Sequence, residues 1–162
     1  MRRVASDSDV IIHLAKLNKV KLIRKLYGCA HIPKYVELEM VQCQYDEVDT
    51  IRQGILKVYE TSDSRARNIA ERYGIHIGEG HVKELAEKLQ AEIFISNERK
   101  VRTAAKDEGF SVVGTIGVIL RGVKENCLTR EEAVGLLHRL RAGEFRIHPS
   151  IIDRALNSLK GM

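Results

Sequence analysis

Acidic and amide side chains that could bind a cation occur in four separate segments of the chain. In each segment they follow an apolar run or lie near the start of a helix-like pattern: "RRVASDSDVIIHL" at 2–14, "IPKYVELEM" at 32–40, "GEGHVKELA" at 78–86 and "EIFISNERK" at 92–100. The residues that could act as ligands are Asp7, Glu39, Glu79, Asn97 and Glu98.

Carboxylates that are brought together repel one another unless a cation compensates their charge. A set of oxygen donors without convergent histidines or cysteines favours Mg²⁺ or Mn²⁺. Such an ion can activate water and stabilise the charge that develops when a phosphodiester is cleaved. We therefore expect a hydrolytic metal centre if these four segments meet in the fold.

Each acid also has a simpler explanation when it is considered alone. Asp9 could cap a helix that begins at Val10, and Glu79 could complement the dipole of the helix that it opens. Glu39 could be a solvated side chain, and Asn97 is an ordinary turn residue. When each position is considered alone, the simpler explanation is favoured at every one of them.

Apolar periodicity and turn residues divide the chain into alternating strands and helices. Pro33 is expected in the first turn of the third helix, and Thr129 with Glu132 forms a capping-box pattern. Strands are expected at 2–6, 29–33, 56–60, 91–96 and 110–114, and helices at 9–17, 20–28, 34–56, 65–73, 78–90, 98–109, 115–126, 128–140 and 148–159.

This alternation predicts a three-layer α/β/α domain with a central, mostly parallel sheet and a pair of C-terminal helices. We expect one domain over residues 1–162, with a core at about 1–122 and a helical extension at about 128–160. Ligands of such sheets bind outside the carboxyl ends of the strands. Asp7, Asn97 and Glu98 are expected at that edge, directly after two of the strands.

Composition narrows the class of protein. Lysine and arginine outnumber aspartate and glutamate by 27 to 22, and only 5% of residues are aromatic. A polyanion is thus an acceptable partner, whereas a base-stacking platform is not expected.

The three cysteines are widely spaced, which predicts reduced thiols. Without an apolar run long enough for a leader or a membrane span, we expect a cytoplasmic protein.

The order of the segments resembles the PIN-domain superfamily, and most closely VapC-like and other compact prokaryotic PIN-like proteins that bind nucleic acid. Five consecutive segments carry the likeness, and "FRIHPSIIDRAL" at 145–156 resembles the C-terminal end of that family. The five are "SDSDVIIHLAKL", "HIPKYVELEM", "GEGHVKELA", "IFISNERKVRTAAKDEGF" and "VVGTIGVIL".

The resemblance places the acids of the family on Asp7, Glu39 and Glu79, with Glu37 as the neighbour that could be confused with Glu39. The fourth acidic position falls on Asn97, an amide, and Glu98 matches the second member of the acid pair. The basic residues Arg99, Lys100 and Arg102 follow at once and are expected either to hold substrate phosphates or to form a solvated helix face.

The family implies a ribonuclease that uses Mg²⁺ or Mn²⁺, with the toxin of a toxin–antitoxin pair as the natural subclass. It also implies RNA as substrate, an antitoxin protein as partner, and a homodimer. Because Asn97 removes one charge, the alternative is a degenerate PIN-like domain that binds RNA or a protein partner without catalysis. A phosphorelay receiver would need a phospho-accepting aspartate after a middle strand and a lysine after the last, and the sequence shows neither.

Overall fold

A five-stranded parallel sheet forms the centre of the computed structural model, which describes residues 3–42, 50, 53–143 and 145–162. The strands lie in the order β3-β2-β1-β4-β5, so the first strand is in the middle. All four pairings are parallel, with Ala5 opposite His31 and Phe94. The strands are β1 (Val4–Ser6), β2 (Ala30–Pro33), β3 (Leu56–Tyr59), β4 (Ile93–Ile95) and β5 (Ser111–Val113).

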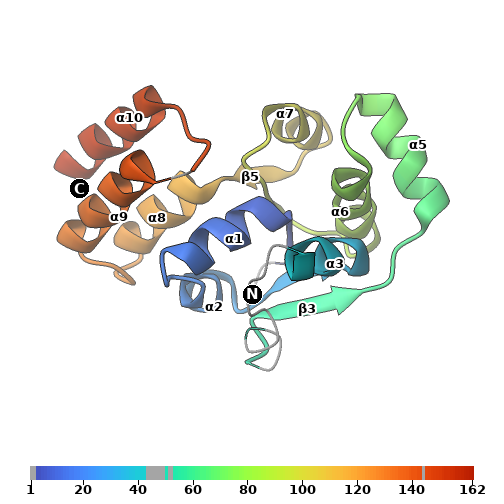
Figure 1. Ribbon diagram of the computed structural model, residues 1–162, viewed down its shortest axis with the longest axis horizontal. Helices are drawn as coiled ribbons and strands as arrows, with labels where there is room; N and C mark the ends of the chain where they lie inside the picture. The colour runs from blue at the N-terminus through green and yellow to red at the C-terminus, as the bar shows by residue number, and fades with distance from the viewer. Residues whose placement is uncertain (1–2, 43–49, 51–52, 144) are drawn as a thin grey trace.

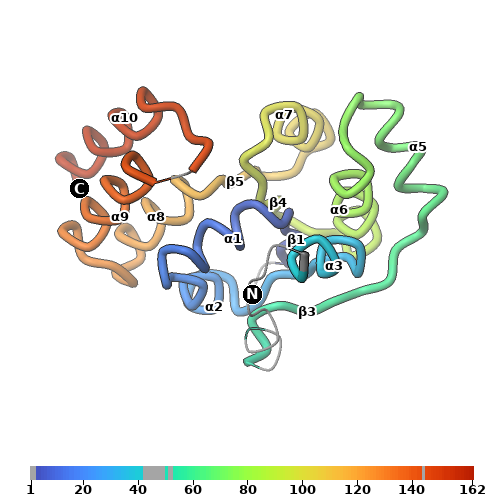
Figure 2. Tube along the Cα trace, in the orientation of Figure 1, coloured from blue at the N-terminus to red at the C-terminus, as the bar shows by residue number. Residues whose placement is uncertain are grey.

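Helices flank this sheet and complete a three-layer α/β/α fold, which confirms the predicted class (Figure 1). The helices within the described residues are α1 (Ser8–Lys16), α2 (Lys21–Tyr27), α3 (Lys34–Gln42), α5 (Asp63–Tyr73), α6 (Ile77–Lys88), α7 (Arg99–Asp107), α8 (Thr115–Lys124), α9 (Arg130–Ala142) and α10 (Pro149–Lys160). The helices α8, α9 and α10 gather at one end of the molecule, and α5 and α6 at the other (Figure 2).

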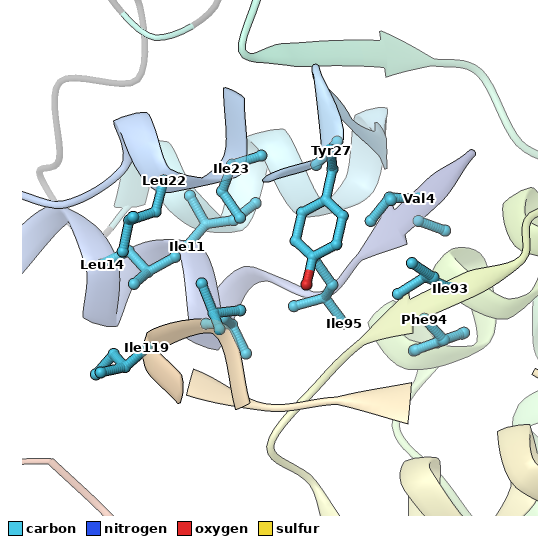
Figure 3. Close-up of a cluster of buried hydrophobic side chains, with 14 of the residues drawn as sticks. Val4, Ile11, Leu14, Leu22, Ile23, Tyr27, Ile93, Phe94, Ile95 and Ile119 are labelled. Carbon is cyan, nitrogen blue, oxygen red and sulfur yellow. The ribbon is translucent and has the colours of Figure 1, made fainter. Parts of the chain in front are cut away.

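The two central strands are apolar along their whole length because helices cover both faces of the sheet. In β1 and β4 every residue is buried. Figure 3 shows Ile95 and Tyr27 beside the apolar side chains of α1 and α2, among them Ile11 and Ile23. This core fixes the position of β1 and β4, and therefore of the polar residues that follow them.

Several helix ends lie where the sequence predicts them. Thr129 and Glu132 form the predicted capping box of α9, with N–H to oxygen distances of 3.1 and 2.8 Å. Gly28 ends α2 with a φ of 82°, a conformation that glycine adopts without strain. Pro149 begins α10, as expected for a proline in the first turn.

The predicted boundaries around the second strand and the helix that follows it are wrong. Pro33 is the last residue of β2, and α3 begins one residue later, because the extended backbone of β2 continues through the proline to pair with Tyr59. The helix predicted over 34–56 cannot reach its predicted end, because Leu56 lies in β3. Part of that stretch, 43–49 and 51–52, lies outside the described residues.

The C-terminal helices are tied to the first helix as well as to each other. The ring of Phe145 meets His13 of α1 edge to face, with 5.0 Å between ring centroids. Arg139 of α9 donates to the backbone carbonyls of Lys16 and Leu17 at the end of α1. Among the described helices, none has the length and apolar character needed to cross a membrane.

Candidate active site at the carboxyl edge of the sheet

Carboxylates from four distant segments line one small pocket beyond the carboxyl ends of β1 and β4. The pocket has a volume of about 120 Å³. It lies where ligands bind in open parallel sheets. Its lining consists of Asp7, Ser8, Asp9, Glu39, His76, Glu79 and Glu98, and we call it the acidic pocket.

Asp7 is the most enclosed of these acids, with 6% of its surface exposed. It is the N-cap of α1, and its Oδ1 accepts a hydrogen bond from the N–H of Ser8 at 2.8 Å. Its Oδ2 accepts from the hydroxyl of Ser96, at the end of β4, at 3.0 Å. Asp7 therefore caps the helix and lines the pocket at the same time.

Asp9 also faces the acidic pocket, in the first turn of α1. Its Oδ1 accepts a hydrogen bond from the N–H of Val10 at 2.8 Å. The alternative that Asp9 caps a helix beginning at Val10 is wrong, because the helix begins at Ser8 and Asp7 caps it. Asp9 instead lies in the first turn of α1 and lines the acidic pocket.

Glu39 reaches the pocket from α3, two residues beyond the other acid of that helix. Its Oε2 accepts from the Ser8 hydroxyl at 3.3 Å. Glu37, the residue that could be confused with it, pairs instead with Lys34 at 2.5 Å. Gly78 leaves room for Glu39, since a β-carbon there would lie 2.5 Å from Glu39 Oε1.

Glu79 and Glu98 enter from the starts of α6 and α7. Glu79 Oε2 accepts from the N–H of His76 at 2.8 Å, and His76 Nδ1 accepts from the N–H of Gly78 at 3.1 Å. This is a capping box in which histidine is the cap. Glu98 is the N-cap residue of α7 and is exposed.

The N-termini of α1, α6 and α7 all lie at the acidic pocket, and their dipoles favour negative charge there. That field does not neutralise the cluster. Burial, followed by repulsion from Asp9 and Glu79, holds the pKa of Asp7 well above its usual range. Burial raises the pKa of Asp9 to about 6, and burial with repulsion from Glu98 and Glu39 raises that of Glu79.

Asn97 does not line the acidic pocket. Its Oδ1 accepts from the N–H of Thr115 at 2.9 Å, and its Nδ2 donates to the Thr115 hydroxyl at 2.8 Å and approaches His13 Nδ1 at 3.1 Å. All of the hydrogen-bonding groups of this amide are thereby directed at α8 and α1. The expectation that Asn97 supplies an oxygen to a metal finds no support in this arrangement.

The basic residues after the turn also point elsewhere. No lysine or arginine belongs to the described lining of the acidic pocket. Arg99 and Lys100 are exposed on α7. Arg102 lines a second, larger cavity of about 510 Å³, bounded by α7, β5, α8 and the start of α10, which we call the α8 groove. Asn97 also lines it, so the turn at 97–98 separates the two cavities.

The donor set of the acidic pocket suits a hard divalent cation, because carboxylate and hydroxyl oxygens dominate it. The raised pKa values of Asp7, Asp9 and Glu79 reflect burial first and repulsion between carboxylates second, and a bound cation would offset both. Within the described residues, however, no three acidic, histidine or cysteine side chains are grouped closely enough to hold an ion as they stand. Binding would therefore require some of the carboxylates to move closer together.

His76 also lines the acidic pocket, although no metal-ligand spacing in the sequence ties it to Glu79. The spacing His76-x-x-Glu79 is that of a capping box, and this pattern could have placed the imidazole beside the acid. Histidine is not among the usual cap residues, so the spacing alone does not predict this cap.

A parallel sheet of this order, with an acidic pocket at its carboxyl edge, is consistent with a nuclease-type α/β fold. The family DUF3368, a PIN domain, matches residues 3–161, nearly the whole chain. The chain therefore belongs to the PIN-domain superfamily, whose members generally use divalent metals and act on nucleic acid. No curated protein matches it.

Proposed function

We propose that this protein is a divalent-metal-dependent ribonuclease that acts at the acidic pocket. The observation that carries the proposal is the meeting of carboxylates from α1, α3, α6 and the β4–α7 turn around a space of about 120 Å³. A cluster of this kind is costly for a fold unless a cation or a protonated state compensates it. Membership in the PIN-domain superfamily supports the cation.

In this proposal Asp7, Glu39, Glu79 and Glu98 hold Mg²⁺ or Mn²⁺, and Asp9 adds negative charge. The ion supplies water activation and charge stabilisation at a phosphodiester. Ser96 and the N–H of Ser8 hold the Asp7 carboxylate in one orientation. The capping box holds Glu79 beside it. Asn97 has no place among the ligands and acts by fixing the turn that carries Glu98.

Cleavage of a labelled single-stranded RNA in Mn²⁺, stopped by a chelator, tests the proposal. Asp7→Asn is expected to abolish cleavage. Glu98→Gln, at an exposed position where folding is not at risk, should reduce it strongly. Asp107→Asn, an exposed acid at the far end of α7, is the matched control and should cut like the wild type. Undiminished cleavage by a folded Asp7→Asn protein would exclude this pocket as the active site.

The second candidate is a degenerate PIN domain that binds RNA or a protein partner and does not cut. Asn97 favours it, because an amide stands where the family has an acid and its hydrogen bonds are all directed away from the pocket. Titration with Mn²⁺ separates the two functions. An absence of binding up to millimolar metal, with RNA binding retained, would establish the degenerate domain.

The toxin subclass and the homodimer are supported only by the resemblance of the sequence to PIN-domain proteins. We propose that the protein is the toxin of a toxin–antitoxin pair, that an antitoxin protein masks it, and that it forms a homodimer. Growth arrest on expression of the wild type, but not of Asp7→Asn, would support the toxin assignment. Light scattering of the purified chain tests the homodimer, and a monomer would exclude it without affecting the proposed activity.

A further inference from the structure

The α8 groove combines an apolar floor with a surplus of positive charge. Aliphatic side chains from β5, α8 and α10 line it, among them Val113, Ile116, Leu120 and Ile151. Among the residues that the structure describes, four cationic side chains share this lining with one acidic side chain, Glu125. Glu125 pairs with Arg121 at 2.9 Å, and the other three cations have no ion-pair partner within that described part of the chain. They are Arg102, Lys124 and Arg146.

These cations are available to a ligand. Lys124 and Arg146 are exposed, and neither forms an ion pair with any part of the chain that the structure describes. The Nε–H of Arg102 is buried and lacks a hydrogen-bond partner among the described residues. A buried donor without a partner costs free energy, which an incoming acceptor such as a phosphate oxygen would recover.

The groove is joined to the acidic pocket through one turn of the chain. Asn97 lines the groove, and the next residue, Glu98, lines the pocket. The two cavities therefore have opposite charge and lie on either side of the same peptide. A polyanion that approaches the pocket is repelled by its carboxylates, and cations in the adjoining groove would offset this repulsion.

We propose that the α8 groove binds the segment of a single-stranded RNA that adjoins the phosphodiester in the acidic pocket. This inference rests on the proposed ribonuclease function and adds the path of the substrate. Phosphates lie against Arg102, Lys124 and Arg146, and nucleosides lie on the aliphatic floor. No tyrosine, phenylalanine or tryptophan belongs to the lining within the described residues, so binding depends on phosphate contacts and little on base identity.

The shape of the cavity selects a single strand. A volume of about 510 Å³ lies in the range of sites that enclose a small ligand, roughly 300–1,000 Å³. Proteins that read a duplex place a protruding helix or ribbon in its groove, or contact the broad minor groove of RNA across a surface. A concave cavity between α7 and α10 offers neither, and it fits an unpaired chain.

Binding of a fluorescently labelled single-stranded RNA, followed by anisotropy in an Asp7→Asn background, tests the proposal without requiring catalysis. Lys124→Ala with Arg146→Ala should weaken binding by about tenfold or more. It should also lower the salt slope of log K by about 1.4, since each phosphate contact on a single strand contributes about 0.7. Arg65→Ala with Arg72→Ala, on α5 at the opposite end of the molecule, is a control with the same change in charge and should leave both values unchanged.

Equal losses in the groove and control variants would overturn the proposal, because they would indicate diffuse attraction by net charge. Duplex RNA that competes as strongly as single-stranded RNA would also overturn the proposal. A groove that binds an acidic peptide and does not bind RNA would overturn it as well. The failure of the proposed function is distinguishable. If RNA binding depends on the groove but the wild type does not cleave RNA in Mn²⁺, the groove proposal stands and the ribonuclease function is excluded. If the wild type cleaves RNA but the groove variant binds it as well as before, the ribonuclease function stands and the groove proposal is excluded.

Discussion

The backbone of Gly78 lies directly against the carboxylate of Glu39. A β-carbon at this position would stand 2.5 Å from Glu39 Oε1 and 3.1 Å from Cε1 of Tyr35. The first turn of α6 and the middle of α3 thus approach closely because residue 78 has no side chain. We infer that this glycine sets the position of Glu39 relative to Glu79.

Gly78→Ala should therefore displace Glu39 and weaken both Mn²⁺ binding and cleavage by about tenfold or more, as is usual when the support of a metal ligand is lost. Titration with Mn²⁺ and the RNA assay measure the two effects. Gly135→Ala in α9 is the matched control, because a β-carbon at that position would have no atom within 4 Å. That substitution should stabilise the helix by about 0.5–1 kcal/mol and leave activity unchanged.

Ser96 is expected to stabilise the buried Asp7 carboxylate through its hydroxyl. Ser96→Ala removes that donor and should cost about 1–3 kcal/mol of unfolding free energy. It should also raise the pKa of Asp7 further, so the loss should be greater at pH 8 than at pH 5. Urea unfolding at both pH values measures this. The exposed Ser111→Ala in β5 is the control, and an equal, small effect of both substitutions would contradict the prediction.

Asp9 and His13 should make opposite contributions to the pH dependence of stability of the metal-free protein between pH 4 and 6, alongside the other shifted acids of the pocket. Burial raises the pKa of Asp9 from 3.8 to about 6, so the folded state holds a proton that the unfolded state releases, and stability falls as pH rises through this range. Burial lowers the pKa of His13 from 6.5 to about 4, so stability falls as pH drops below 6.5.

Asp9→Asn should consequently make the slope of unfolding free energy against pH more positive than in the wild type, and His13→Gln should make it more negative. Chemical denaturation in a chelator at a series of pH values between 4 and 6.5 gives the slopes. Slopes that are the same in all three proteins would show that neither group is shifted as described.

Asn97→Asp tests whether the missing charge of the fourth acidic position matters. The new carboxylate would remain beside Thr115 and His13, where the amide now lies. We expect the pKa of His13 to return from about 4 toward 6.5, and Mn²⁺ affinity to change little. NMR titration of His13 and a Mn²⁺ titration measure these effects. A gain of tenfold or more in Mn²⁺ affinity would instead show that the side chain reaches the pocket and that the wild-type site is a weakened one.

The fold and the positions of most of the acids follow from local patterns in the sequence. Asp7 can be placed at a strand end because β1 is apolar and the helical spacing begins directly after it. The division into a core at about 1–122 and an extension at about 128–160 stays a prediction, since nothing in the structure tests it.

The orientation of Asn97 could not be predicted in this way. Its partners Thr115 and His13 lie 18 and 84 positions away in the chain, and only their packing decides which side of the turn the amide faces. Local pattern also could not decide which of Glu37 and Glu39 lines the pocket, because both lie on α3. Glu37 is held by its ion pair with Lys34, whereas Glu39 is placed by the Ser8 hydroxyl and by the space at Gly78.

The strand order also has a consequence for the chain while it is being made. The central strand β1 pairs on one side with β2, and on the other with β4, which begins only at Ile93. Glu98 and the Ser96 hydroxyl that holds Asp7 follow that strand. A growing polypeptide on the ribosome therefore cannot assemble the acidic pocket until well over half of its 162 residues have been joined. Whatever chemistry the pocket performs is withheld during the first part of synthesis by the topology alone.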